Sequence, residues 1–95
     1  MHVTTRVEWR VCDALPNYEP SAYSQEGFIH CCTQEQLQGV LTRYFKGKKG
    51  LLLLYIDKSK LEKPLIYEVS TNGELFPHIY GVINKDAVVN IEVIP

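Results

Sequence analysis

One apolar run stands out in the chain of 95 residues, namely Leu51-Leu52-Leu53-Leu54-Tyr55-Ile56, followed by Asp57. Gly47 and Gly50 precede it and mark a turn. A continuous apolar run of this length between turn signals is typical of a strand that is buried on both faces. The sequence therefore predicts a central strand at 51–57, against which the rest of the chain packs.

Two helices are predicted before this strand. Thr5-Arg6-Val7-Glu8 fits a capping box, and Thr33 with Gln36 repeats its spacing. We expect the first helix to run to about Leu15 and the second to about Phe45. Their apolar stripes are expected to face the core; these are Val7, Val11, Ala14 and Leu15 in the first helix, and Leu37, Val40, Leu41, Tyr44 and Phe45 in the second.

The remaining segments are predicted to be strands and turns. A polar, turn-rich loop covers residues 16–25, and Asn72-Gly73 predicts a tight turn. Phe76-Pro77 is expected to be extended or sharply bent, because proline excludes helical geometry from the residue before it. Further strands are expected at 1–4, 28–31, 65–70 and 89–93. This order predicts a single α+β domain over residues 1–95, with two helices packed on a mainly antiparallel sheet.

Composition limits the function classes. Hydrophobic residues make up 45% of the chain and charged residues 22%, with a formal net charge of -1. A chain without excess positive charge is not expected to bind nucleic acid or an anionic membrane non-specifically. No apolar run is as long as a membrane span or a signal-peptide core, and the cysteine count of 3 is a poor disulfide framework. We therefore expect a cytoplasmic protein.

Metal binding is not expected from the pattern of cysteines and histidines. The chain has no C-x-x-C pair, and in a strand His30, Cys31 and Cys32 would alternate between opposite faces. Motifs of serine hydrolases, phosphate-binding loops and dinucleotide-binding folds are also absent. Any chemistry must therefore come from a different arrangement of residues.

Two stretches contain most of the residues suited to catalysis. One is Gly73 to Gly81, which contains Glu74, His78 and Tyr80; the other is Glu26 to Thr33, which contains His30. We expect these stretches, with His2 and Thr4, to form one polar pocket. Imidazoles and carboxylates are the usual groups for acid–base catalysis near neutral pH.

Each of these residues also has a structural interpretation. A histidine beside apolar residues in a strand is often a core residue with satisfied hydrogen bonds, because an unpaired buried polar group costs about 1 to 3 kcal/mol. Glu74 is either solvated after its turn or faces His78 as a base, and Glu68 on the preceding strand is the alternative carboxylate. A nucleophilic thiol at Cys31 or Cys32 is the less favoured alternative.

The motifs resemble a known family. His2 to Thr5 with Glu8-Trp9, then Glu26 to Cys31, then Gly73 to Gly81 resemble the small domain-of-unknown-function family numbered nine hundred and fifty-two. That family is grouped by fold with the ADP-ribosyltransferase-like proteins. The resemblance implies a twisted, split sheet around a cleft of nucleotide size.

The resemblance also implies roles for individual residues. His2 and Thr4 resemble the strand-borne His-x-Thr that contacts the ribose of NAD in active members. His30 stands where the RNA 2′-phosphotransferase branch has a histidine, while Cys32 replaces the usual serine. Glu74 corresponds to the catalytic glutamate by its order along the chain. The chain departs from active members by its short length and by the lack of arginines that match those used on phosphates.

These observations lead to two hypotheses of different classes. In the first, the protein is a transferase or hydrolase acting on a nucleotide or ADP-ribose-like ligand, with NAD as a candidate substrate. Its catalytic residues are predicted to be His2, His30, Glu74 and His78, and its ligand-binding residues Thr4, Cys32, Glu68 and Tyr80. In the second, the same residues form a non-catalytic binding module for a small anionic ligand or a protein partner.

Overall fold

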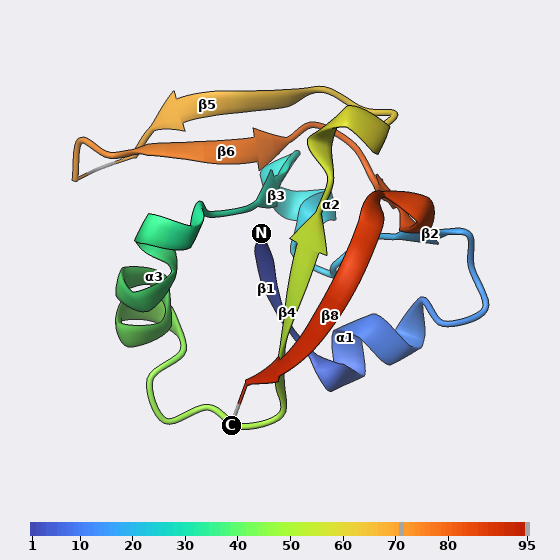
Figure 1. The fold of residues 1–95 in the computed structure, drawn as a ribbon, viewed down its shortest axis with the longest axis horizontal. Helices are drawn as coiled ribbons and strands as arrows, with labels where there is room; N and C mark the ends of the chain where they lie inside the picture. The colour runs from blue at the N-terminus through green and yellow to red at the C-terminus, as the bar shows by residue number, and fades with distance from the viewer. Residues whose placement is uncertain (71, 95) are drawn as a thin grey trace.

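The computed structural model describes residues 1–70 and 72–94. Its strands form antiparallel sheets joined by short helices, which makes the domain a small α+β fold (Figure 1). The strands are β1 (His2–Thr5), β2 (Asn17–Tyr18), β3 (Ile29–His30), β4 (Leu51–Ile56), β5 (Leu65–Val69), β6 (Leu75–Ile79), β7 (Ile83–Asn84) and β8 (Val88–Ile94). The α-helices are α1 (Arg6–Val11), α2 (Tyr23–Glu26) and α3 (Leu37–Tyr44), and the 3₁₀ helices are η1 (Gln34–Gln36), η2 (Lys58–Lys60) and η3 (Lys85–Ala87).

The central sheet has the strand order β1-β4-β8. Strand β4 pairs with β1 on one side and with β8 on the other, so that Leu54 lies between His2 and Ile91. Residues Leu51 to Leu54 are all buried. The sheet lies between α3 on one face and α1 on the other (Figure 1). The prediction of a central strand buried on both faces is therefore confirmed.

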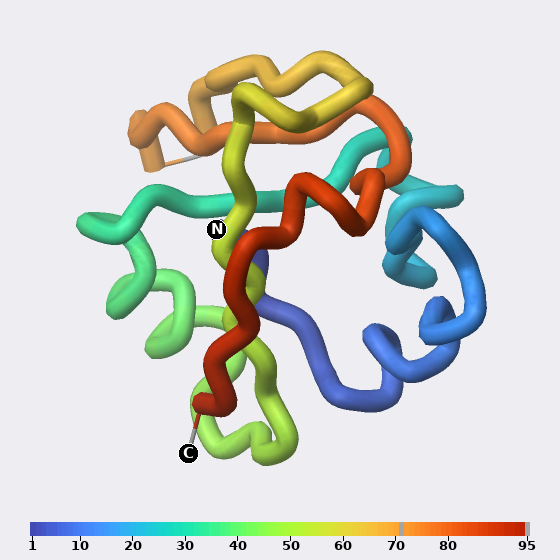
Figure 2. Tube along the Cα trace, turned by 45° about the vertical axis from the view of Figure 1, so that its right-hand side comes forward, coloured from blue at the N-terminus to red at the C-terminus, as the bar shows by residue number. Residues whose placement is uncertain are grey.

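A second sheet of order β3-β6-β5 lies across one end of the molecule. The β5–β6 hairpin runs above the central sheet in both Figure 1 and Figure 2. Gly73 in its turn has φ 85°, a value that glycine adopts without strain. Pro77 lies within β6, as the expected extended geometry requires, and its carbonyl accepts from the Cys31 amide at 3.0 Å.

The core lies between the two sheets and the β2–β7 pair. Its buried members are Cys12, Tyr18, Ile29, Cys31, Leu52, Leu54, Ile79 and Ile83. Tyr18 is completely buried, although it comes from the segment predicted to be a loop at 16–25. That segment contains β2 and α2. Elements of two and four residues are too short to produce a periodic pattern, so the sequence did not indicate them.

The first helix differs from its prediction. It ends at Val11 rather than near Leu15, and Val7 and Val11 are 71% and 73% exposed. The expectation that this stripe faces the core is wrong. Trp9 and Cys12 pack toward Tyr18 and the core instead, and these contacts decide which side of so short a helix is buried.

The helix N-termini agree better with the capping predicted from the sequence. Thr5 Oγ1 accepts from the Glu8 amide at 3.1 Å, and Gln36 Oε1 accepts from the Thr33 amide at 3.0 Å. The Glu8 carboxylate does not close its capping box, because it binds Ser21 instead. The stripe on α3 is half-buried at Leu37, Val40, Leu41 and Phe45 and exposed at Tyr44. None of the helices in the described part of the chain is long and apolar enough to cross a membrane.

Candidate functional site

Two histidines meet on one face of the second sheet. His30 on β3 is the direct pairing partner of His78 on β6, so both side chains project from the same face. Their ring centroids are 5.2 Å apart and nearly perpendicular. Phe28, just before β3, stacks on His78 at 4.2 Å and meets His30 edge-on at 4.8 Å. We call Glu26, Phe28, His30, Glu68, His78 and Tyr80 the histidine cluster.

Glu68 joins His78 and Tyr80 within this cluster. Its Oε1 accepts from His78 Nδ1 at 2.8 Å and from the Tyr80 hydroxyl. Hydrogen bonds from Tyr80 and then from His78 lower the pKa of the Glu68 carboxyl, and the same carboxylate raises the pKa of Tyr80. Because Nδ1 of His78 donates to the carboxylate, Nε2 is the basic nitrogen of the neutral ring. The carboxylate thus fixes the orientation of the His78 ring.

His30 has a carboxylate partner of its own. Its Nε2 contacts Glu26 Oε2, and the two side chains are 59% and 41% exposed. Gly27 has φ 79° and ends α2, which allows the chain to turn from Glu26 into β3. An ion pair with this exposure adds little stability, since water screens it. His30 is the imidazole of the cluster that is open to solvent.

His2 and Thr4 belong to a different, buried network. His2 Nδ1 donates to the His30 carbonyl at 2.6 Å, and the Tyr18 hydroxyl lies 3.1 Å from His2 Nε2 and 2.7 Å from Thr4 Oγ1. Burial lowers the pKa of His2 to about 4 and raises that of Tyr18. The expectation of one pocket shared by His2, Thr4 and His78 is wrong, because Tyr18 fills the space beside His2. His2 supports the backbone of His30.

Glu74 lies away from the histidine cluster. It contacts Arg43 Nη2 at 3.3 Å, Asn72 Nδ2 at 3.1 Å and Gln36 Nε2 at 3.4 Å, near the tip of the β5–β6 hairpin. Four residues of extended chain, about 13 Å, separate it from His78. The expectation that Glu74 faces His78 is wrong, and Glu68 is the carboxylate that does.

Cys31 and Cys32 are buried. Burial raises the pKa of Cys31 to about 12 and also raises that of Cys32, so both thiols stay protonated and unreactive at neutral pH. Both line a hollow of about 170 Å³ with Pro77 and Ile79, and Lys58 contributes to its rim. Ile79 alternates with His78 along β6, so its side chain points to the opposite face of the sheet from the histidine cluster.

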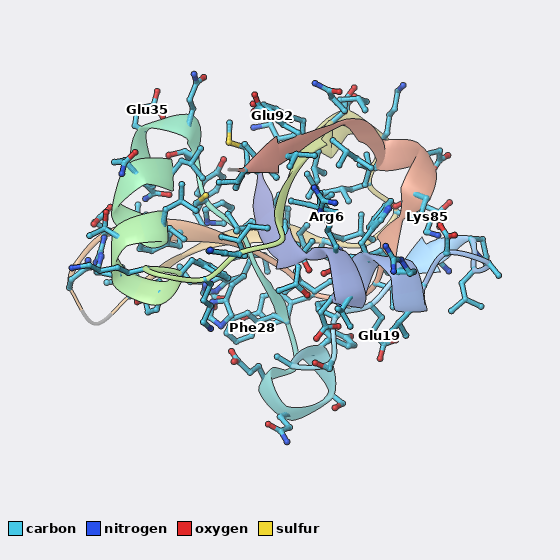
Figure 3. All side chains as sticks on the ribbon, turned by 90° about the horizontal axis from the view of Figure 1, so that it is seen from below. Arg6, Glu19, Phe28, Glu35, Lys85 and Glu92 are labelled. Carbon is cyan, nitrogen blue, oxygen red and sulfur yellow. The ribbon has the colours of Figure 1, made fainter. Side chains whose placement is uncertain are left out.

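Two members of the cluster were not assigned a role from the sequence. Glu26 and Phe28 lie in the stretch that was singled out for His30 and Cys32. Glu26 and His30 are four residues apart with Gly27 between them, and this spacing is the one sequence signal from which their contact could have been predicted. Figure 3 shows Phe28 on the same side of the molecule as α2. No set of three or more His, Cys, Asp or Glu side chains within residues 1–70 and 72–94 is arranged to hold a metal ion.

Comparison with known proteins supports the resemblance to the domain-of-unknown-function family, and none of the matches is to an ADP-ribosyltransferase-like protein. No curated protein gives a significant match. The X-ray structure of protein CC0527 from Caulobacter crescentus is similar, with a TM-score of 0.85 and 30% identity, over 95% of this chain and 80% of that chain. Its solution NMR structure has a TM-score of 0.80 and 32% identity, over 95% of this chain and 78% of that one. The model of the family described as "Protein of unknown function (DUF952)" matches residues 3–91, and the chain therefore belongs to the DUF952 family.

Proposed function

We propose that the protein is a transferase or hydrolase that acts on a ribose-bearing nucleotide or ADP-ribose-like ligand at the histidine cluster. The observation that carries this proposal is the arrangement of two imidazoles 5.2 Å apart, one of them held by a carboxylate that also binds Tyr80. A carboxylate can stabilise the positive charge that develops on a sugar carbon, and an imidazole can transfer a proton near neutral pH.

Each residue has a chemical role in this proposal. The ionised Glu68 carboxylate stabilises the positive charge that develops on the sugar carbon when its bond to the leaving group breaks. His30, whose side chain is 59% exposed, exchanges a proton with the leaving group or the attacking hydroxyl. Phe28 and Tyr80 offer aromatic surface against which a base or ribose ring packs.

NAD is the candidate substrate, and the support for it is the likeness of the His2 and Thr4 stretch to ribose-contacting motifs. Because both side chains lie behind Tyr18, the proposed chemistry belongs to Glu68, His30 and His78 rather than to His2. His2 acts in this scheme through the hydrogen bond that it donates to the His30 carbonyl.

The test is incubation of the protein with NAD and, separately, with RNA that carries a 2′-phosphate. We expect turnover by the native chain and its loss in Glu68→Gln, which keeps the shape of the side chain but removes the charge. Glu74→Gln is the matched control and is expected to retain activity, since Glu74 contacts Arg43 rather than the histidines. If the native chain shows neither turnover nor saturable binding with these ligands, the proposal fails.

A second candidate function is a non-catalytic binding module for a protein partner or a small anionic ligand. The observation in its favour is that the His30 and Glu26 side chains are 59% and 41% exposed, so this part of the cluster is open to a partner. In this case His30→Ala and His78→Ala lose the bound ligand, as measured by calorimetry, while the ligand itself stays chemically unchanged. Conversion of the ligand by the native chain would contradict it.

A further inference from the structure

The edge of the central sheet at β8 is uncovered. Strand β8 pairs with β4 on one side, and no other strand in the described part of the chain pairs with its outer side. Val89, Ile91 and Val93 are 55%, 42% and 55% exposed. The opposite edge, β1, differs because His2, Val3 and Thr4 are buried. An exposed edge strand presents unpaired backbone N–H and C=O groups that can pair with another strand.

Strand β8 also lacks the features that usually protect such an edge. Its residues, Val88 to Ile94, include no lysine and no proline. Its single charged side chain, Glu92, accepts a hydrogen bond from the Tyr55 hydroxyl at 2.7 Å. The irregularity in its pairing lies near its start, where Val89 falls between the paired residues Val88 and Asn90 without a partner on β4, while Asn90 to Ile94 pair regularly. The rest of β8 is therefore a regular, accessible edge.

The apolar side chains of β8 continue the apolar layer of the core. Ile91 is the pairing partner of Leu54, and Val93 is the partner of Leu52. Directly paired residues project from the same face, so the exposed side chains of Ile91 and Val93 lie beside the buried leucines of β4. A further strand added at this edge would extend both the hydrogen-bond ladder and the apolar face.

We propose that the partner at this edge is a second copy of the chain, with the two β8 strands paired antiparallel about a two-fold axis at Ile91. In that register Ile91 faces Ile91 of the other copy, and Val89 faces its Val93. Asn90 faces Glu92 of the other copy, so a charged side chain meets an amide that can donate a hydrogen bond to it. Every apolar residue thus meets an apolar one, as an interface between identical surfaces requires.

Neighbouring registers fit less well. A shift that centres the axis on Glu92 places two carboxylates directly opposite each other, which is repulsive. A shift that centres it on Asn90 places Glu92 against the apolar Val88 of the other copy. A shift by a single residue places the apolar face of one copy next to the polar face of the other. The side chains of β8 therefore select the register centred on Ile91.

The other uncovered edge, β5, is less suited to pairing with itself. Pro64 precedes it, and Glu68 in its middle is held by His78 and Tyr80. A register centred on Tyr67 would place Ile66 against Glu68 of the other copy. Figure 3 shows Glu92 and Phe28 on opposite sides of the molecule, so pairing at β8 leaves the histidine cluster accessible. The proposal is therefore independent of the proposed function.

Cross-linking tests the register. Ile91→Cys brings two thiols together in the proposed dimer, and mild oxidation is expected to give a disulfide-linked dimer on a non-reducing gel. Val89→Cys is the matched control, because its partner in the other copy is Val93 and two cysteines at 89 are too far apart to join. The natural Cys12, Cys31 and Cys32 are buried and provide a low background. Equal cross-linking of the two variants would overturn the register.

Sedimentation of the full chain over a wide range of concentrations tests the dimer itself. Asn90→Glu places like charges opposite Glu92 twice in the dimer and is expected to raise the dissociation constant about tenfold. Asn90→Lys places opposite charges there and is expected to lower it. Asn90 is exposed, so neither substitution should disturb the fold, and circular dichroism should give the same spectrum for both variants as for the native chain. The proposal would be overturned if the native chain sediments as a monomer at every concentration, or if neither variant changes the dissociation constant of the dimer.

Discussion

At the scale of single residues, the position of Glu68 decides what the candidate site contains. The side chain comes from β5, while the groups that it binds, His78 Nδ1 and the Tyr80 hydroxyl, come from β6 and the segment after it. The sequence indicated Glu68 as a ligand-binding residue and as the alternative carboxylate to Glu74. The hairpin register settles the choice, because Ile66 is paired with His78 and Glu68 is therefore diagonal to it on the same face.

His2 makes stability depend on pH. Burial lowers the pKa of its ring from 6.5 to about 4, so the unfolded chain binds the proton more tightly than the folded one. The stability is therefore complete above pH 6.5 and is lost as the pH falls toward 4. A shift of this size, at about 1.4 kcal/mol per pKa unit, amounts to about 3 kcal/mol. Urea denaturation at a series of pH values measures this change in the free energy of unfolding.

The control for this prediction is His2→Gln, which has no titrating ring. It is expected to be less stable than the native chain at pH 7, because a buried hydrogen bond to the His30 carbonyl is altered. Its stability is expected to change much less over the same pH interval. A native chain whose unfolding midpoint stays constant from pH 7 to pH 4.5 would contradict the burial of a neutral His2.

At the scale of elements, the link from α2 to β3 brings Glu26 and His30 of the histidine cluster together. Gly27 ends α2 in the left-handed region, with φ 79°, and no atom lies near where its Cβ would be. Gly27→Ala is therefore opposed by backbone strain alone and is expected to cost about 1 kcal/mol of unfolding free energy. Chemical denaturation measures the loss, and Gly27→Asn should lose less because asparagine tolerates this conformation better.

The matched glycine is Gly39 in α3, whose φ is not positive. Gly39→Ala is expected to stabilise the protein by up to about 1 kcal/mol, since alanine is the better helix former. Only the end of the Arg43 side chain lies close to the added methyl group, and this flexible chain can move. A destabilisation at Gly39 equal to that at Gly27 would show that strain is not the cause.

At the scale of the whole molecule, the two sheets and the β2–β7 pair are joined through one core. Leu54 is fully buried in the centre of β4 and belongs to the cluster that also includes Ile79 of the second sheet. Leu54→Ala is expected to cost about 2 to 5 kcal/mol, from lost burial and the cavity left behind. For a domain whose total stability is about 5 to 15 kcal/mol, thermal unfolding should show a large fall in Tm.

Leu75→Ala is the comparison for this variant. Leu75 is 53% exposed near the hairpin turn, and its truncation is expected to change stability by less than about 1 kcal/mol. Similar losses for both variants would mean that the core is not centred on β4.

Much of the fold was visible in the sequence, but less of the site. The central strand, the hairpin turn at Gly73, the Thr5 cap and the capping box of Thr33 and Gln36 were predicted, and the structure confirms them. The prediction that the apolar stripe of α1 faces the core was wrong, because six helical residues are too few for periodicity to show which side is buried. His30 and His78 do lie together, whereas His2, Thr4, Cys32 and Glu74 lie elsewhere.

The amino-acid sequence by itself determined the central strand, the helix starts and the α+β class of the domain, because these follow from local patterns of burial and turn formation. Only the tertiary structure decided which carboxylate serves His78 and which tyrosine covers His2. The partners Glu68 and Tyr18 are 10 and 16 residues away from these histidines. Strand register and core packing determine which of these distant groups come into contact, and no local sequence pattern indicates the result.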